Sequence, residues 1–118
     1  MGNFRKLKVW QEGKELAVQI YKITHSGPIS KDFGLKDQLQ RASVSIPSNI
    51  AEGDELGTNK QSNRFFHIAK GSTAEVITQL IIAEEIGYLS SDVVKPLLDK
   101  AEKISSMLNK LIQHRKLP

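Results

Sequence analysis

The sequence predicts an all-α fold: an up-down-up-down antiparallel four-helix bundle that forms a single domain over residues 1–118. Three observations predict it. Apolar residues recur at helical spacing in four segments, short breaks rich in Gly, Pro, Ser and Asn separate these segments, and no run alternates apolar and polar residues as a β-strand would. A chain of 118 residues is long enough to enclose a hydrophobic core.

The first two helices are predicted over residues 7–24 and 30–56. The first ends at Ser26-Gly27-Pro28, because proline cannot continue a helix. Pro47 lies inside the second segment and removes one backbone hydrogen bond, so either two helices meet there or one helix bends. The apolar stripe continues in phase across Pro47, which favours one helix with a proline kink.

The third and fourth helices follow short polar breaks. The third is predicted over residues 60–87, with Thr58 or Asn59 as its N-terminal cap and Gly87 at its end. The fourth begins after Ser90 or Ser91 and has the most regular pattern. Its apolar residues alternate between spacings of three and four, which is typical of a packed bundle helix, and they are Val94, Leu97, Ala101, Ile104, Leu108 and Leu111.

The second and third segments are apolar or small on more than one face. The core arc of the third is predicted to contain Phe65, Ile68, Ser72, Val76 and Ala83. The remaining apolar residues fit either a central helix in a thick core or a second face buried against other copies of the chain, and we favour a homo-oligomer. The predicted oligomer interface consists of Val44, Pro47, Ser48, Ala51, Phe66, Thr73, Ile77 and Ile81.

Polar residues form a further arc on the same two segments. They are interpreted either as a solvated or hydrogen-bonded structural network or as a site for a partner. The residues concerned are Arg41, Ser45, Asn49, Glu52, His67 and Glu75.

Motifs for catalysis and for cofactors are lacking in the sequence. None of the three histidines follows a glutamate by three residues, as a di-metal carboxylate bundle requires, and there is no glycine-rich phosphate loop and no cysteine. The sequence therefore predicts a protein that is not an enzyme and has no metal or cofactor. No apolar run is long enough to span a bilayer and no secretory signal is recognisable, so we expect a cytoplasmic protein without a membrane partner.

The formal net charge is +4, and an up-down bundle concentrates it at one end. That end gathers the start of the first helix, the second connection and the end of the fourth helix, with the acids Glu12, Glu52, Asp54 and Glu55. A cluster of this kind is either a solvated rim or a surface for a nucleic-acid backbone. The candidate phosphate contacts are Arg5, Lys6, Lys8, Lys60, Arg64, Lys110, Arg115 and Lys116.

Four stretches carry a family resemblance that covers nearly the whole chain. They are Phe4 to Trp10-Gln11 with Glu15-Leu16 and Ile20-Tyr21; Gly34-Leu35 with Gln38-Leu39 and Arg41-Ala42; the specific block Ser45-Ile46-Pro47-Ser48-Asn49-Ile50-Ala51-Glu52-Gly53; and Phe65 with Ile68-Ala69, Gly71-Ser72 and Glu75. With these stretches the chain resembles the bacterial four-helix-bundle proteins encoded by intervening sequences of the 23S ribosomal RNA gene.

The resemblance extends to the accessory variability protein of diversity-generating retroelements. That relative implies a homopentamer that binds nucleic acid and a reverse transcriptase. The chain departs from the family pattern at Gly13, where members usually carry Ala, and at Asp54-Glu55-Leu56, where Gly and Arg are common. Asp54 and Glu55 add negative charge to the basic end and so weaken the argument for nucleic-acid binding.

The leading functional hypothesis is a non-enzymatic oligomeric scaffold that binds RNA or DNA through the basic end. The alternative is an adaptor that binds another protein on the polar arc around Arg41, Asn49 and Glu52, with no nucleic acid involved.

Overall fold

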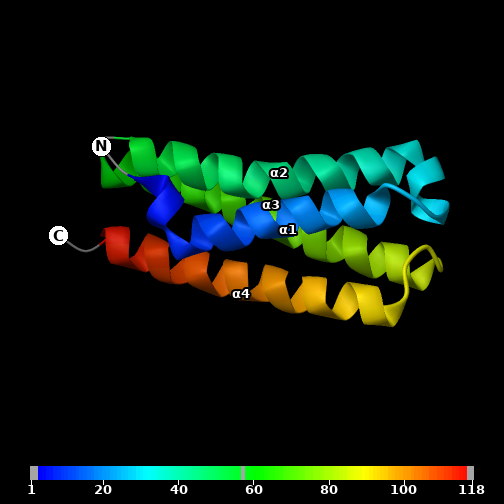
Figure 1. Ribbon diagram of the computed structural model, residues 1–118. Helices are drawn as coiled ribbons and strands as arrows, with labels where there is room; N and C mark the ends of the chain where they lie inside the picture. The colour runs from blue at the N-terminus through cyan, green and yellow to red at the C-terminus, as the bar shows by residue number, and fades with distance from the viewer. Residues whose placement is uncertain (1–2, 57, 117–118) are drawn as a thin grey trace.

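The computed structural model describes residues 3–56 and 58–116. They form the predicted all-α fold, with four long helices: α1 (Lys8–Thr24), α2 (Phe33–Glu55), α3 (Asn59–Glu85) and α4 (Ser91–Lys116). The helices run alternately up and down in a body of 48 × 21 × 19 Å (Figure 1). Two 3-10 turns, η1 (Phe4–Lys6) and η2 (Pro28–Lys31), precede α1 and join α1 to α2.

Short polar side chains fix the starts of three helices. Asp32 caps α2, because its Oδ1 accepts a hydrogen bond from the backbone N–H of Leu35 at 3.1 Å. Thr58 caps α3 in the same way, with the backbone N–H of Gln61 at 3.2 Å from its Oγ1. Ser90 accepts a hydrogen bond from the first turn of α4. The capping residues named from the sequence for α3 and α4 therefore include the ones that the structure uses.

The α1–α2 and α3–α4 connections lie at the same end of the bundle, and each contains a glycine with positive φ. Gly27 and Gly87 have φ of 76° and 84°, a left-handed region that favours glycine. The hydroxyl of Tyr88 donates to Asp32 Oδ2 at 3.0 Å, and this contact ties the α3–α4 connection to the start of α2.

Helix α2 is a single helix that passes through Pro47 without a break. Of the two alternatives for this segment, the structure shows one helix; the kink itself stays a prediction. Helix α1 crosses α2 closely at this point. A Cβ added to Gly13 would lie 3.1 Å from Ile46 Cγ2 and 3.6 Å from Pro47 Cδ, so the small residue at position 13 permits the close approach.

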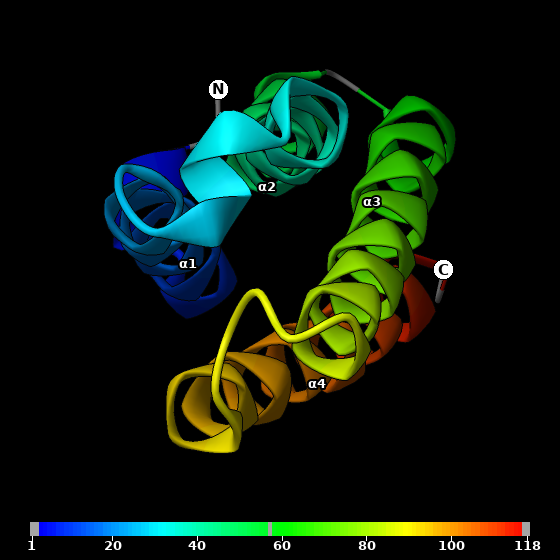
Figure 2. The same cartoon turned by 90° about the vertical axis from the view of Figure 1, so that its right-hand side faces the viewer.

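The four helices surround one core (Figure 2). In α3 the predicted arc is buried at Ser72, Val76 and Ala83. Nearer the start of the helix it is wrong by one position: Phe66 and Ala69 are fully buried, whereas Ile68 is 43% exposed. In α4 the buried residue of the last turns is Ile112, and Leu111 packs only partly against the core. Both differences arise because each helix contacts two neighbours, which turns its buried arc away from the centre of its apolar residues.

Candidate functional site

A basic recess lies at one end of the bundle. Helix α1 begins and α4 ends at this end (Figure 1). The recess has a volume of about 590 Å³ and lies between the start of α3 and the end of α4. Spacings of four and three along α3 place its basic residues on one face of that helix. Among residues 3–56 and 58–116 no acidic side chain lines the recess; the lining residues are Asn59, Lys60, Asn63, Arg64, His67, Arg115 and Lys116.

One of these cations is already paired. Arg115 Nη2 lies 3.0 Å from Asp54 Oδ1, and the side chains of Arg115 and Asp54 are only 22% and 7% exposed. The guanidinium carbon also lies 5.4 Å from the centre of the Phe66 ring. Arg115 therefore holds α4 against α2 and α3, and its charge is largely used within the chain. Sequence reasoning counted it as a free phosphate contact because it could not place Asp54 beside it.

Two side chains near the start of α3 hold the wall of the recess. Asn63 Nδ2 donates to the backbone oxygen of Ile112 in α4 at 3.2 Å, and Ser62 Oγ donates to the backbone oxygen of Gly53 in α2 at 2.6 Å. The Ile112 carbonyl can only accept, which fixes the orientation of the Asn63 amide. The backbone around the basic residues is thus attached to both neighbouring helices.

A second groove lies on the other side of the end of α4. It has a volume of about 350 Å³, and Lys8 of α1 lines it together with Lys110 and His114 of α4. The rest of its lining is apolar: Val9, Met107 and Leu111. The last turns of α4 therefore lie between a basic recess and an apolar groove that carries basic residues. Arg5 and Lys6 belong to η1, where the Arg5 guanidinium carbon is 5.9 Å from the centre of the Phe4 ring.

The structure thus brings six of the eight predicted cations to the basic recess and the second groove beside the end of α4. Those in the recess are Lys60, Arg64, Arg115 and Lys116, and those in the second groove are Lys8 and Lys110.

The acids predicted at this end differ in their surroundings. Asp54 is paired with Arg115, and Glu12 is paired with lysines of α4 further along the bundle. Glu52 and Glu55 line a separate apolar groove of about 420 Å³ with Phe4, Ala51 and Phe65. None of the four acids lines the basic recess or the second groove.

Three polar side chains at the α2–α3 contact satisfy one another. The Ser45 and Ser72 hydroxyls are 2.8 Å apart, and Asn49 Nδ2 donates to both the backbone oxygen and the hydroxyl of Ser45. Arg41 pairs with Asp37 at 2.8 Å on the exposed side of α2. His67 lines the basic recess instead, and Glu75 and Glu52 lie in two other grooves. The six residues of the predicted polar arc therefore do not form one site.

The predicted oligomer interface needs a correction. Phe66 and Thr73 are fully buried inside the chain, because α3 is covered by both α2 and α4, so they cannot contact another copy on the outer surface. Ile77 packs partly against the core. The other predicted interface residues reach the surface in different places: Val44 and Pro47 line a groove beside α1, Ala51 lines the groove at Phe4, and Ser48 and Ile81 are exposed.

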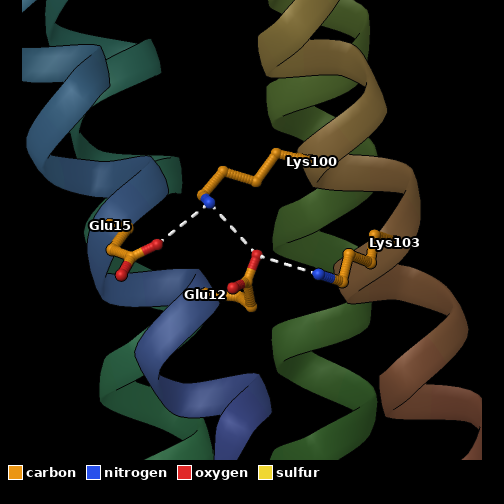
Figure 3. Close-up of polar contacts among 4 residues, drawn as sticks. All are labelled: Glu12, Glu15, Lys100 and Lys103. Atoms are coloured by element: carbon orange, nitrogen blue, oxygen red, sulfur yellow. Dashed lines mark hydrogen bonds and ion pairs between the residues drawn. The ribbon is translucent and has the colours of Figure 1, made fainter.

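An ion-pair network between α1 and α4 was missed by sequence reasoning (Figure 3). Lys100 Nζ lies 3.1 Å from Glu12 Oε1 and 3.0 Å from Glu15 Oε2, and Lys103 Nζ lies 3.6 Å from Glu12 Oε1. The spacing of three residues in both pairs, Glu12/Glu15 and Lys100/Lys103, is the available sequence signal, since such residues share a helix face.

The network shifts two pKa values. The hydrogen bond from Lys100 lowers the pKa of Glu12, and the charges of Lys100 and Lys103 add to this effect while burial opposes it. For Lys100, burial alone would lower the pKa, but hydrogen bonds and charge from Glu15 and Glu12 together raise it. The network therefore favours the charged form of both groups.

Within residues 3–56 and 58–116, no group of three or more His, Cys, Asp and Glu side chains is arranged to hold a metal ion. No helix in this part of the chain combines the length and the apolar character needed to cross a membrane.

Comparison with known proteins identifies the family. A family model described as "23S rRNA-intervening sequence protein" matches residues 5–110. The chain is similar in fold to a crystal structure of a protein of unknown function from the S23 ribosomal protein family of Bacteroides thetaiotaomicron VPI-5482. The TM-score is 0.81 at 22% identity, over 88% of this chain and 97% of the other. No curated protein matches the chain significantly. Because the family model spans most of the chain, the protein belongs to the 23S rRNA-intervening sequence protein family.

Proposed function

We propose that this chain is a non-enzymatic, homo-oligomeric scaffold of the cytoplasm that binds the phosphate backbone of RNA or DNA at the end of α4. The observation that carries the proposal is the recess between α3 and α4, whose described lining consists of basic and amide side chains without an acidic one. Its walls are held to α2 and α4 by hydrogen bonds, so the cations are presented on a fixed backbone.

The cations open to a ligand differ from those expected on sequence alone. Lys60, Arg64 and Lys116 are exposed at the basic recess, and Lys8 and Lys110 are exposed at the second groove. Arg115 is paired with Asp54 and contributes less. Each phosphate neutralised by such a cation releases counterions, so affinity falls with salt, with a slope of about −0.9 per contact for duplex DNA and about −0.7 for single strands.

A protein-binding adaptor is the second candidate, and a reverse transcriptase or another protein would be its partner. It has less support, because Ser45 of the polar arc is already hydrogen-bonded to both Asn49 and Ser72. The homopentamer implied by the resemblance stays a prediction.

Fluorescence anisotropy with labelled RNA and DNA at two salt concentrations tests the proposal. We expect binding that weakens steeply with salt. A Lys60→Gln, Lys116→Gln double variant should bind more weakly and have a salt slope smaller in magnitude by roughly 1 to 2, since two phosphate contacts are lost.

The matched control is the Lys31→Gln, Lys95→Gln double variant, which removes the same charge from exposed positions at the opposite end of the bundle. Equal losses in the two variants would mean that only net charge matters. Absence of binding at low salt would overturn the nucleic-acid proposal and leave the adaptor.

A further inference from the structure

The side chain of Asn63, at the wall of the basic recess, leaves one polar atom without a partner. The residue is only 9% exposed, and its Nδ2 donates to the backbone oxygen of Ile112 at 3.2 Å. Its Oδ1 is buried and accepts no hydrogen bond within residues 3–56 and 58–116. Exchanging the two amide atoms would not help, because the Ile112 carbonyl can only accept. A buried acceptor without a donor is uncommon in a native protein and needs an explanation.

A ligand in the recess supplies that explanation, because Asn63 is one of the lining residues. Asn59 and His67 lie one turn before and after it on the same face of α3, and both are exposed, so their side chains can change rotamer when a ligand enters. The ligand has to bring a hydrogen-bond donor for Oδ1 as well as an anion for the surrounding cations. A phosphodiester carries no proton at neutral pH, so the donor belongs to a neighbouring group. The ribose 2′-hydroxyl is such a donor in every RNA nucleotide, and DNA lacks it.

The start of α3 adds a site for an anion at the same recess. Thr58 satisfies two donors of the first turn, since its Oγ1 and its backbone oxygen accept from the N–H groups of Gln61 and Ser62. The N–H groups of Asn59 and Lys60, two residues that line the recess, form no hydrogen bond within the described part of the chain. Such N–H groups at the start of a 27-residue helix carry partial positive charge and attract phosphate.

The charge of the recess exceeds what one phosphodiester needs. Lys60, Arg64 and Lys116 are exposed there, and none of them forms an ion pair among the described residues. A phosphodiester within a strand carries a single negative charge. A phosphate monoester, as found at a strand end, carries about −1.5 to −2 at pH 7 and has three acceptor oxygens. The monoester is therefore the better match for three cations and a helix start.

The shape of the recess also favours a strand end. Its volume of about 590 Å³ lies within the range of roughly 300–1,000 Å³ that is usual for sites of small ligands. The cations surround this one recess at the end of a 48 Å body and are not spread along a groove that follows the helices. A recess of this kind suits one terminal nucleotide better than a run of backbone phosphates.

We propose that the recess binds the phosphorylated end of an RNA strand. The terminal phosphate monoester lies among Lys60, Arg64 and Lys116 at the start of α3, and the 2′-hydroxyl of the same nucleotide donates to Asn63 Oδ1. A 5′-phosphorylated and a 3′-phosphorylated end both offer this chemistry, and the experiment below separates them. The inference rests on the proposed function and adds which part of the nucleic acid the recess takes.

Fluorescence anisotropy on the full chain tests the inference with matched pairs of short RNA strands of one sequence. The first pair carries a 5′-phosphate or a 5′-hydroxyl and is labelled at the 3′ end; the second carries a 3′-phosphate or a 3′-hydroxyl and is labelled at the 5′ end. One phosphorylated strand should bind about tenfold more tightly than its hydroxyl counterpart, the effect of about one charge-assisted hydrogen bond. The pair that shows the difference identifies which end the recess takes.

A pair of variants tests whether the recess causes the preference. Arg64→Gln removes one exposed cation from the recess and should bring the affinities for phosphorylated and hydroxyl ends close to each other. Lys110→Gln removes the same charge from the second groove and should lower both affinities by the same factor, so that their ratio stays at the wild-type value. Circular dichroism checks that both variants keep the wild-type helicity.

A change in the RNA tests the contact with Asn63 without altering the protein. One 2′-deoxynucleotide at the preferred phosphorylated end keeps the phosphate and removes the donor, so the affinity should fall about threefold to tenfold. The control places the deoxynucleotide in the middle of the strand, where it should have little effect. Equal effects at the two positions would overturn the assignment of the 2′-hydroxyl to Asn63.

The remaining outcomes separate this inference from the proposed function. Equal affinities for phosphorylated and hydroxyl ends in both pairs, with binding that still weakens with salt, would overturn the inference and leave backbone binding intact. A wild-type ratio in the Arg64→Gln variant would overturn the placement of the terminal phosphate in this recess. Absence of binding by every strand at low salt would overturn the proposed function itself.

Discussion

Arg115 at the end of α4 lies 3.0 Å from Asp54 at the end of α2, and the same guanidinium packs over the ring of Phe66 in α3. One side chain thus joins three helices at the bundle end that carries the basic recess. A buried carboxylate is costly unless it is paired, so Asp54 requires this arginine. The ion pair therefore supports the shape of the recess rather than adding a free cation to it.

Replacing Arg115 should affect stability more than replacing its neighbour. Arg115→Met leaves the nearly buried Asp54 carboxylate unpaired and should lower the free energy of unfolding by about 2–3 kcal/mol. Lys116→Met removes the same charge from an exposed position and should change it by less than about 0.5 kcal/mol. Urea unfolding followed by circular dichroism compares the two. Equal changes in the free energy of unfolding would show that the Arg115–Asp54 contact does not stabilise the fold.

Lys100 should stabilise the contact between α1 and α4. Its ammonium lies within 3.1 Å of two carboxylates, and its side chain is 18% exposed. Lys100→Met keeps an apolar side chain at this position. It removes the shorter of the two lysine contacts of Glu12, whose side chain is mostly buried. We expect a loss of about 1–2 kcal/mol, between the usual values for exposed and buried ion pairs. Lys95→Met, an exposed lysine on the same helix, is the control, and a loss of the same size there would contradict the prediction.

The lowered pKa of Glu12 makes part of the stability depend on acid pH. The folded-state pKa lies below the ordinary value of 4.5, so the contribution is fully present above that value and is lost as pH falls through the folded-state pKa. Denaturant unfolding at pH 6, 4 and 3 should show a smaller acid-induced loss for Glu12→Gln than for the wild type. Parallel losses in the two proteins would mean that Glu12 makes no such contribution.

Gly53 should not tolerate a side chain. A Cβ there would lie 2.6 Å from Phe66 Cε1 and 3.0 Å from the backbone oxygen of Ser62, so either the ring or the α2–α3 contact has to move. Gly53→Ala should cost about 1–3 kcal/mol despite the better helix propensity of alanine. Gly34→Ala is the control, since its Cβ would meet only Asp32 Oδ1 at an ordinary 3.7 Å. Calorimetry should show a lower melting temperature for the first variant alone.

The sequence was sufficient to predict the four helices, because the signals that place them are local. Thr58 and Ser90 cap helices through their nearest turns, and Gly87 closes α3 without help from distant residues. The buried positions at the start of α3 could not be predicted in the same way. Its apolar residues extend over a wide arc, and only the positions of α2 and α4 decide that Phe66 is inside and Ile68 is outside.

The candidate site was predictable in outline only. Up-down connectivity alone brings Lys60 and Lys116 to the same end of the bundle, so charge counting finds the region. The pairing of Arg115 with Asp54 joins residues 61 positions apart, and no local sequence pattern indicates it. The same holds for Lys100 and Glu12, which are 88 positions apart.

Helix α1 begins and α4 ends at the bundle end that carries the basic recess, whereas the connection between α3 and α4, which contains Gly87, lies at the opposite end (Figure 1). An affinity tag or fusion partner on either terminus would therefore stand beside the surface proposed to bind phosphate. A polyhistidine tag would add basic groups there and imitate binding, and a bulky partner would block access. The binding assays should therefore use tag-free protein. Any fluorophore should be attached near Gly87, because that turn lies at the opposite end of the bundle from the proposed phosphate-binding surface.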